Sequence, residues 1–226
     1  MRAPAKELAV RALELLLGLT IAHLGVTLFL LSNLGSDPFN VLIQGLHSAL
    51  PWPAFMDTHG RVHLLVSLLI MLVLLLAAKG FVKIGTVICM ALGGPIIDLW
   101  EMLLGPMLGV LPLGGRIALL VAGCVILAFG MTVVISSDLG AGPNDLVAVS
   151  ISELSKKPFG VVRVCVDVAF ALVGWLLGGV LGVGTVVCAF LVGPVAQFCF
   201  PLSRRLCARG LTRAGINPES TFAEDK

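Results

Sequence analysis

The chain carries six apolar runs, each long enough to cross a membrane as a helix. They cover residues 8–31, 61–79, 84–104, 115–136, 160–180 and 183–203. A helix of about twenty residues spans the roughly 30 Å hydrocarbon core of a bilayer. These runs lack the two-residue alternation of barrel strands, so helices are the structures that satisfy every backbone group in lipid. The sequence therefore predicts an all-α integral membrane protein with six transmembrane helices.

No segment outside these runs indicates a separate soluble domain. Hydrophobic residues make up 58% of the chain and charged residues only 12%, about half the charged fraction of a soluble domain. We expect one transmembrane domain over residues 1–203 and a polar cytoplasmic tail over 204–226 that frays. The first run resembles a signal peptide, but it is too long and has no small-residue cleavage site, so it is predicted to remain as a helix.

The basic residues predict the orientation. With six spans and a cytoplasmic N-terminus, the cytoplasmic side holds twelve of them and the outer side two, Arg61 and Arg116. The twelve are Arg2, Lys6, Arg11, Lys79, Lys83, Lys156, Lys157, Arg204, Arg205, Arg209, Arg213 and Lys226. Cytoplasmic loops carry such an excess. Both termini are therefore expected in the cytoplasm, and the net charge of +2 reflects orientation rather than nucleic-acid binding.

An interrupted apolar segment occurs twice. The stretch "LSNLGSDPFNVLIQGL" from Leu31 returns 105 residues later within "ISSDLGAGPNDLVAVSI", and "KIGTVICMALGGPIIDLW" from Lys83 returns 99 residues later as "GVGTVVCAFLVGPVAQFC". Residues 8–104 and 115–203 thus form two repeats. Each has a helix, a Gly/Pro break, a short helix and two further helices.

Three spans per repeat is an odd number, so the second repeat enters the membrane inverted, as in many secondary transporters. The first break then faces outside and the second faces the cytoplasm. The alternative counts the short segments 38–50 and 143–155 as spans, which gives eight helices and parallel repeats. At 13 residues these segments are too short to cross, and the charge bias weakens.

Each break is predicted to start a short helix, because Pro38 and Pro143 suit the first position of a helix. Free N–H groups at such a start can bind an anion or orient a polar solute. The side chains that could line the two mouths are Asn33, Ser36, Asp37, Asn40, Asp138, Asn144 and Asp145. Helix capping is the simpler interpretation of any one of them. Two helices that stop partway through a membrane need a further reason, and solute contact supplies one.

The third and sixth runs each contain a Gly-Pro pair near their middle. These pairs, Gly94-Pro95 and Gly193-Pro194, should kink the two helices, because proline removes a backbone hydrogen bond. Freed carbonyls can coordinate cations or act as hinges. Proline kinks also occur in membrane helices that bind nothing, so the matching positions carry the argument.

Four ionisable residues in the third and fifth runs need a polar environment: Asp98, Glu101, Arg163 and Asp167. Asp98 corresponds to Gln197 in the other repeat and is predicted to be the proton- or cation-responsive group. Asp167 can pair with Arg163 four residues away and is predicted to line a polar path on the cytoplasmic side. Arg163 is close enough to the surface to snorkel, whereas Glu101 should be satisfied by water.

No catalytic or metal-binding pattern is present. The six cysteines include no C-x-x-C pair and are expected to be free thiols. His59 and His63 are four apart, but no third ligand is fixed by spacing, so a helix-end cluster is the simpler interpretation. Phosphate-cradling, zinc-protease and G-x-S-x-G motifs are missing. We therefore expect neither an enzyme nor a cofactor.

The motifs "LGSDPFNVLIQGL", "LGAGPNDLVAVSIS", "KIGTVICMALGGPIIDLW" and "GVGTVVCAFLVGPVAQF" resemble those of the YczE/YitT-like family of bacterial integral membrane proteins, over about residues 10–203. The resemblance implies a protein of the bacterial cytoplasmic membrane and carries no biochemical activity with it. The family often has an aromatic residue after the first motif's proline, here Phe39. The second copy has Asn144 instead, which leaves open which half holds a shared site.

Two functions from different classes fit these features. The first is a secondary transporter or permease for a small polar solute. The second is a scaffold or accessory protein for a partner complex. Transport predicts stabilisation by a solute, whereas an accessory role predicts co-purification with a partner. A homodimer is compatible with both, and a lipid-modifying enzyme is the weakest alternative.

Overall fold

The computed structural model describes residues 5–35, 37–54, 59–77, 80–108 and 111–216, and the regular elements in these ranges are α-helices. They are α1 (Ala5–Leu31), α2 (Pro38–Ala49), α3 (His59–Ala77), α4 (Ile84–Leu108), α5 (Leu113–Ser136), α6 (Pro143–Ser155), α7 (Phe159–Leu176) and α8 (Val183–Arg213). Each predicted run holds one helix. The two short helices also begin at the predicted prolines.

Five of the described helices are long and apolar enough to cross a membrane: α1, α4, α5, α7 and α8. The apolar stretch of α3 that meets the same criteria of composition, Arg61–Leu76, is shorter. Large apolar side chains cover much of the outer surface; Leu76, Met107 and Phe198 are 71%, 79% and 84% exposed. Such a surface is stable in contact with lipid and not with water.

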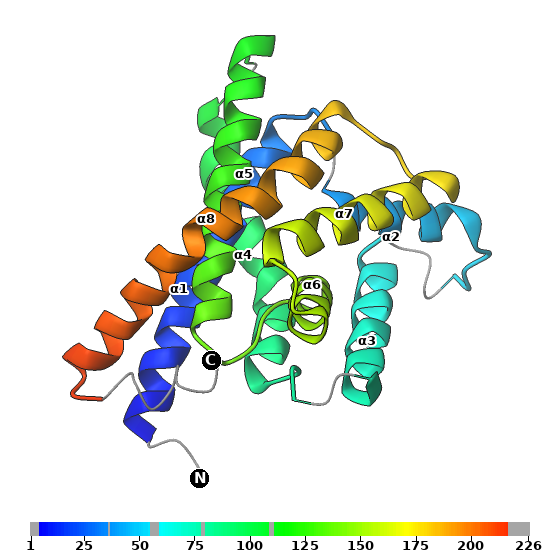
Figure 1. The fold of residues 1–226 in the computed structure, drawn as a ribbon. Coiled ribbons are helices and arrows are strands. Elements are labelled where there is room, and N and C mark those ends of the chain that lie inside the picture. Colours follow the sequence, from blue (N-terminus) through cyan, green and yellow to red (C-terminus); the bar gives the residue numbers. More distant parts are fainter. Residues whose placement is uncertain (1–4, 36, 55–58, 78–79, 109–110, 217–226) are drawn as a thin grey trace.

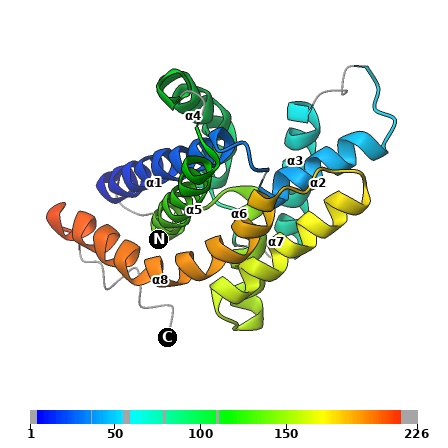
Figure 2. The same ribbon diagram turned by 90° about the horizontal axis from the view of Figure 1, so that it is seen from above.

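The helices form two groups (Figures 1 and 2). The first group consists of α1, α4, α5 and α8, with α1 and α5 packed along their lengths. The second consists of α2, α3, α6 and α7, in which the two short helices lie between α3 and α7. The groups meet mainly where α7 packs against α8.

Four glycines let the backbones of α1 and α5 touch. A Cβ atom on Gly25 would lie 2.3 Å from the Leu127 amide nitrogen, and one on Gly130 would lie 2.2 Å from that of Ala22. Gly18 faces Val134 and Gly123 faces Gly25, so the two helices run antiparallel. Gly18 and Gly25 lie 105 residues before Gly123 and Gly130. We call this contact the glycine seam. Small residues permit such close helix packing in membranes.

The two breaks have the same backbone conformation. Asn33 and Asp138, which are 105 residues apart, have φ angles of 51° and 60°, in the left-handed region that asparagine and aspartate tolerate. Gly35 and Gly140 follow with φ angles of 148° and 129°, which side chains rarely adopt. The repeated sequence therefore encodes a repeated turn.

Each break is bonded to the start of a helix from the other repeat. The Gly85 N–H of α4 donates to the Leu139 carbonyl of the second break at 2.8 Å. The Gly184 N–H of α8 donates to the Leu34 carbonyl of the first break, also at 2.8 Å. These four residues occupy matching repeat positions. Since the breaks follow the C-terminal ends of antiparallel helices, the two bonds lie at opposite ends of the glycine seam.

The chain after Arg204 does not fray as predicted, because α8 continues to Arg213. Cys207 and Leu211 are 2% and 1% exposed, and this part of α8 packs against α1. The tail was predicted to fray from its charges alone, and the apolar face that contains Cys207 and Leu211 was overlooked. The helix boundary at 203 was therefore wrong, and residues 217–226 lie outside the described part.

The Gly-Pro pairs lie within continuous helices, and α8 curves along its length in Figure 2. Their surroundings differ. A Cβ atom on Gly193 would lie 2.5 Å from the Gly160 carbonyl oxygen of α7, whereas one on Gly94 would meet nothing within 4 Å. Only the second pair lies at a close contact between the two groups of helices.

We expect Gly25→Ala and Gly130→Ala each to destabilise the protein, because the new methyl group would overlap backbone atoms of the partner helix. Overpacking of this kind costs about 1–3 kcal/mol. Thermal unfolding of the detergent-solubilised protein should show a lower Tm for both variants. Gly94→Ala is the matched control and should melt no lower than the wild type. Equal Tm values for all three variants would contradict the glycine seam.

Candidate functional site

A pocket of about 590 Å³ lies between the two groups of helices. We call it the α8 pocket. Its lining residues are Ile135 of α5, Val149, Ser152 and Glu153 of α6, Phe159 of α7, and Gln197, Phe200, Pro201, Arg204 and Arg205 of α8. This volume is in the range of small-molecule sites. The pocket is therefore a candidate site for a small solute, at a boundary that relative motion of the groups would change.

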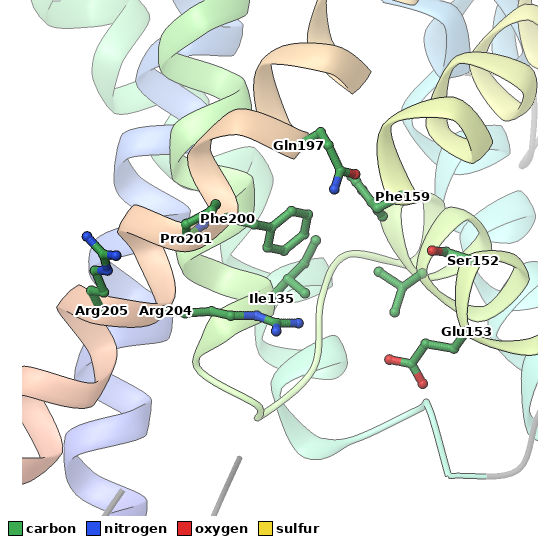
Figure 3. A pocket seen from close by; sticks show the side chains of 10 residues that line it. Ile135, Ser152, Glu153, Phe159, Gln197, Phe200, Pro201, Arg204 and Arg205 are labelled. Carbon is green, nitrogen blue, oxygen red and sulfur yellow. The ribbon is translucent and has the colours of Figure 1, made fainter. Parts of the chain in front are cut away.

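One wall of the α8 pocket is aromatic and the others carry polar groups (Figure 3). Phe159 and Phe200 meet edge to face with ring centroids 5.1 Å apart, and the Arg204 guanidinium lies 5.9 Å from the Phe200 centroid. Figure 3 shows Arg204 reaching toward Ile135, with Glu153 on the opposite side. Charged groups of both signs thus border an aromatic surface.

Gln197, predicted as a site residue, lines this pocket. Its side-chain oxygen accepts a hydrogen bond from the Gly160 N–H of α7 at 2.9 Å, at the start of that helix. The first N–H groups of a helix have no acceptor within the helix, and this bond satisfies one of them. It also fixes the amide group of Gln197 at the junction of α7 and α8.

Asp145, Arg163 and Asp167 form a charged cluster in which Arg163 and Asp167 are buried and Asp145 is half-buried. The Arg163 Nε donates to Asp167 at 2.9 Å and its Nη1 donates to Asp145 at 2.5 Å. Arg163 is 7% exposed and Asp167 1%. The predicted pairing with Asp167 is confirmed, whereas the expectation that Arg163 snorkels to the surface was wrong. Two carboxylates around one guanidinium satisfy the arginine from two sides and leave an excess of negative charge.

The cluster lies one helical turn from the α8 pocket on two helices. Val149 and Phe159 line the pocket, and Asp145 and Arg163 lie four residues from them on α6 and α7. Residues four apart share a helix face. The charged cluster therefore lies beside the pocket without lining it.

At the first break, the predicted residues cap a helix. Asp37 is the N-cap of α2 and accepts hydrogen bonds from the Phe39 and Asn40 N–H groups at 3.1 Å. The Asn40 side chain donates to the other Asp37 oxygen at 2.5 Å. Capping therefore describes Asp37.

Two arginines in matching repeat positions clamp the breaks. Arg11 donates to the Ser137 carbonyl at 3.2 Å, and Arg116 donates to the Ser32 carbonyl at 2.7 Å. Arg116 also bonds the carbonyl of Asn33, whose side chain is exposed. Each clamp comes from the first helix of the opposite repeat, whereas the exchanged backbone bonds come from the last helix of that repeat.

The second break carries further ionic contacts. Asp138 pairs with Arg11 at 3.2 Å and with Lys83, and Arg11 also binds Glu7 at 2.9 Å. Asp138 is thus part of an ionic network beside the break and does not reach the buried cluster. The sequence interpretation used Arg11, Lys83 and Arg116 only for orientation. The spacing of 105 residues between the two arginines was the signal that it overlooked.

The remaining predicted residues are placed as follows. Asn144 is half-buried at the start of α6, and Glu101 is exposed on α4. Ser36 and the side chain of Asp98 lie outside the described residues. The structure thus brings Asp145, Asp167 and Gln197 near one pocket and leaves Asn33 and Asp138 at opposite breaks. Among the described residues, no group of three or more His, Cys, Asp or Glu side chains could hold a metal ion.

The sequence interpretation missed two polar residues within the first apolar run. His23 is half-buried, bonds the Leu19 carbonyl at 2.7 Å and faces Gly93 of α4. Glu14 lies near Cys207 and Gly210 of α8. Their presence in a run of membrane-spanning length was a sufficient signal, because such groups need a polar environment.

Comparison with known proteins gives the family. The model described as "Family of unknown function (DUF6198)" matches residues 9–201. The chain belongs to this family. It is 30% identical over 209 residues to the uncharacterized membrane protein YczE of Bacillus subtilis, covering 92% of this chain and 94% of YczE, which supports the YczE-like resemblance. An uncharacterized protein of Haemophilus influenzae is 32% identical over 196 residues, covering 85% and 84% of the two chains.

A third relative is the uncharacterized protein YyaS of Bacillus subtilis, 24% identical over 190 residues, 84% of this chain and 92% of YyaS. No solved structure matches the chain significantly. With its apolar helices, the likeness to YczE makes this a membrane protein with several transmembrane helices.

We expect Arg163→Gln to destabilise the protein, because it leaves the buried Asp167 and the half-buried Asp145 without a cation. Removing one partner of a buried ion pair lowers the free energy of unfolding by about 3–5 kcal/mol. Thermal unfolding should show a large drop in Tm for this variant. The double variant Arg163→Gln/Asp167→Asn should recover part of the loss.

Arg209→Gln, which alters an exposed arginine of α8, is the control and should melt like the wild type. If Arg163→Gln melts like this control, the charged cluster does not stabilise the fold.

Proposed function

We propose that this protein is a secondary transporter or permease for a small polar solute across the bacterial cytoplasmic membrane. The observation that carries the proposal is the α8 pocket, which lies between two groups of helices and one turn from a buried charged cluster. Intramembrane charges in transporters mark substrate or ion paths. A site between two groups that can move apart also suits alternating access.

The proposed topology has six membrane-spanning helices in two inverted repeats, with both termini in the cytoplasm. The antiparallel glycine seam and the exchanged bonds at the two breaks support it, since matching residues make matching contacts at opposite ends of the seam. The basic residues place the second break and the α8 pocket on the cytoplasmic side. The pocket would then be open inward.

Repeat symmetry identifies the residues that would line the pocket in an outward-open state. Gln197 and Phe200 of the pocket correspond to Asp98 and Glu101, 99 residues earlier. In an inverted repeat these residues lie toward the outer face, where they would form the opposite mouth. The two groups would rock about the contact between Gly160 and Gly193. Asp98 would provide the proton- or cation-responsive charge, and Asp167 would hold the inner end of the path.

Solute identity can be found by thermal shift of the purified protein against amino acids, organic anions, sugars and metal ions. A stabilising solute is then tested by counterflow in proteoliposomes. We expect Gln197→Leu to lower counterflow per folded protein at least about tenfold, since one hydrogen bond to a charged group is worth about 1.5–3 kcal/mol. Its Tm should fall slightly, because the Gly160 N–H loses its acceptor. Phe198→Leu, which alters an 84% exposed neighbour, should transport normally.

If no solute stabilises the protein and it instead co-purifies stoichiometrically with another membrane protein, the accessory role replaces transport. Equal counterflow by the Gln197 and Phe198 variants would move the solute site away from the α8 pocket.

The topology is tested separately by cysteine labelling. Leu50→Cys and Ser155→Cys, at exposed and matching positions at the C-terminal ends of α2 and α6, are made in a background without the six native cysteines. An impermeant maleimide added to intact cells should label Cys at position 50, whereas position 155 should react only after the membrane is opened. Labelling of both positions from the same face would exclude inverted repeats.

A further inference from the structure

A second cavity, of about 550 Å³, lies between α1, α5 and α8, away from the α8 pocket. We call it the α1 groove. Its walls are mostly apolar and include Leu13, Leu17, Ile21, Phe129, Val133 and Leu206. Leu13 and Leu17 are 58% and 55% exposed, so the groove opens on the apolar outer surface of the helices. An occupant therefore enters from the lipid and needs an apolar chain.

The groove contains a carboxyl group that is incompletely satisfied. Glu14 lines it, and the Oε1 atom of Glu14 is buried and accepts no hydrogen bond from the described residues. Cys207 contributes only a thiol, which is a weak donor. Arg11 is close enough to act electrostatically, but its guanidinium already donates to Glu7, Ser137 and Asp138.

The absence of a side chain at Gly210 leaves room for this carboxyl group. A Cβ atom on Gly210 would lie 2.4 Å from Glu14 Oε1, so any larger residue there would displace the carboxyl group. A buried acceptor of this kind is costly unless a donor or a positive charge binds it. A cationic donor at Glu14 would satisfy this acceptor.

A positive charge lies at the same cavity. Arg213, in the last turn of α8 and three residues beyond Gly210, also lines the groove. The groove thus combines an apolar wall, a buried acceptor and a basic group at its rim. A solely anionic headgroup would suit Arg213 and be repelled by Glu14, and a solely cationic one would leave Arg213 unused.

We propose that the α1 groove binds a phospholipid whose headgroup carries a primary ammonium beside its phosphate. The ammonium donates to Glu14, the phosphate faces Arg213, and one acyl chain lies along the apolar wall. The residues that line this groove differ from those of the α8 pocket, so the proposal is independent of transport.

Native mass spectrometry of the purified protein with added lipid tests this site. The three probes are phosphatidylethanolamine, phosphatidylcholine, whose quaternary ammonium cannot donate a hydrogen bond, and phosphatidylglycerol, which has no ammonium. We expect retention of phosphatidylethanolamine at least about tenfold above the other two, the ratio that one charged hydrogen bond supplies. Glu14→Gln should remove this preference, and Gly210→Ala should weaken it by displacing the carboxyl group.

Glu101→Gln, which removes an exposed carboxylate outside the groove, is the control and should keep the preference. Arg213→Gln should lower retention of phosphatidylethanolamine and phosphatidylglycerol alike. This exposed position tests the site even if changes at Glu14 and Gly210 prevent folding. The proposal is overturned if the wild type retains the three lipids equally, or if Glu14→Gln keeps the preference. It is also overturned if the protein is a dimer that retains no lipid.

Discussion

Two backbone hydrogen bonds, from Gly85 to Leu139 and from Gly184 to Leu34, position much of this molecule. A helix that stops within a membrane leaves polar backbone groups without water, and each unsatisfied group costs several kcal/mol. Here each break satisfies one such group with the first N–H groups of a helix from the other repeat. That bond ties the first turns of α4 and α8 to the two breaks. The glycine seam makes the exchange possible, because it holds α1 and α5 at backbone contact with a break at either end.

This exchange also explains why the chain contains the same interruption twice. Each break accepts a hydrogen bond from the start of a helix of the other repeat, so the two copies of the interruption satisfy each other. The clamps formed by Arg11 and Arg116 follow the same rule, since each reaches a serine carbonyl at the break of the opposite repeat. Hydrogen bonds to the backbone therefore give a reason for the repeated interruption that does not depend on a solute.

The sequence predicted the helices well because membrane-spanning length and proline position are local properties. Pro38 and Pro143 marked helix starts without tertiary information, and so did the apolar runs. The end of α8 was missed because the burial of Cys207 and Leu211 depends on α1, and a count of charges does not reveal it. The cluster of Asp145, Arg163 and Asp167 was predicted only within α7, since its contact with α6 is set by packing. For the same reason the pocket around Gln197 could not be derived from spacing.

The two repeats share a backbone arrangement but differ in their side chains, and this difference bears on the mechanism. The cluster of Asp145, Arg163 and Asp167 has Asn40, His63 and Ser67 at the matching positions of the first repeat, where only His63 is ionisable. Among the described residues, Arg11 and Lys83 bind the second break, and Arg116 binds the first. We infer that closing the pocket moves α7 against α8 at Gly160 and Gly193, where backbones already touch, while both breaks stay bonded to the frame of α1 and α5.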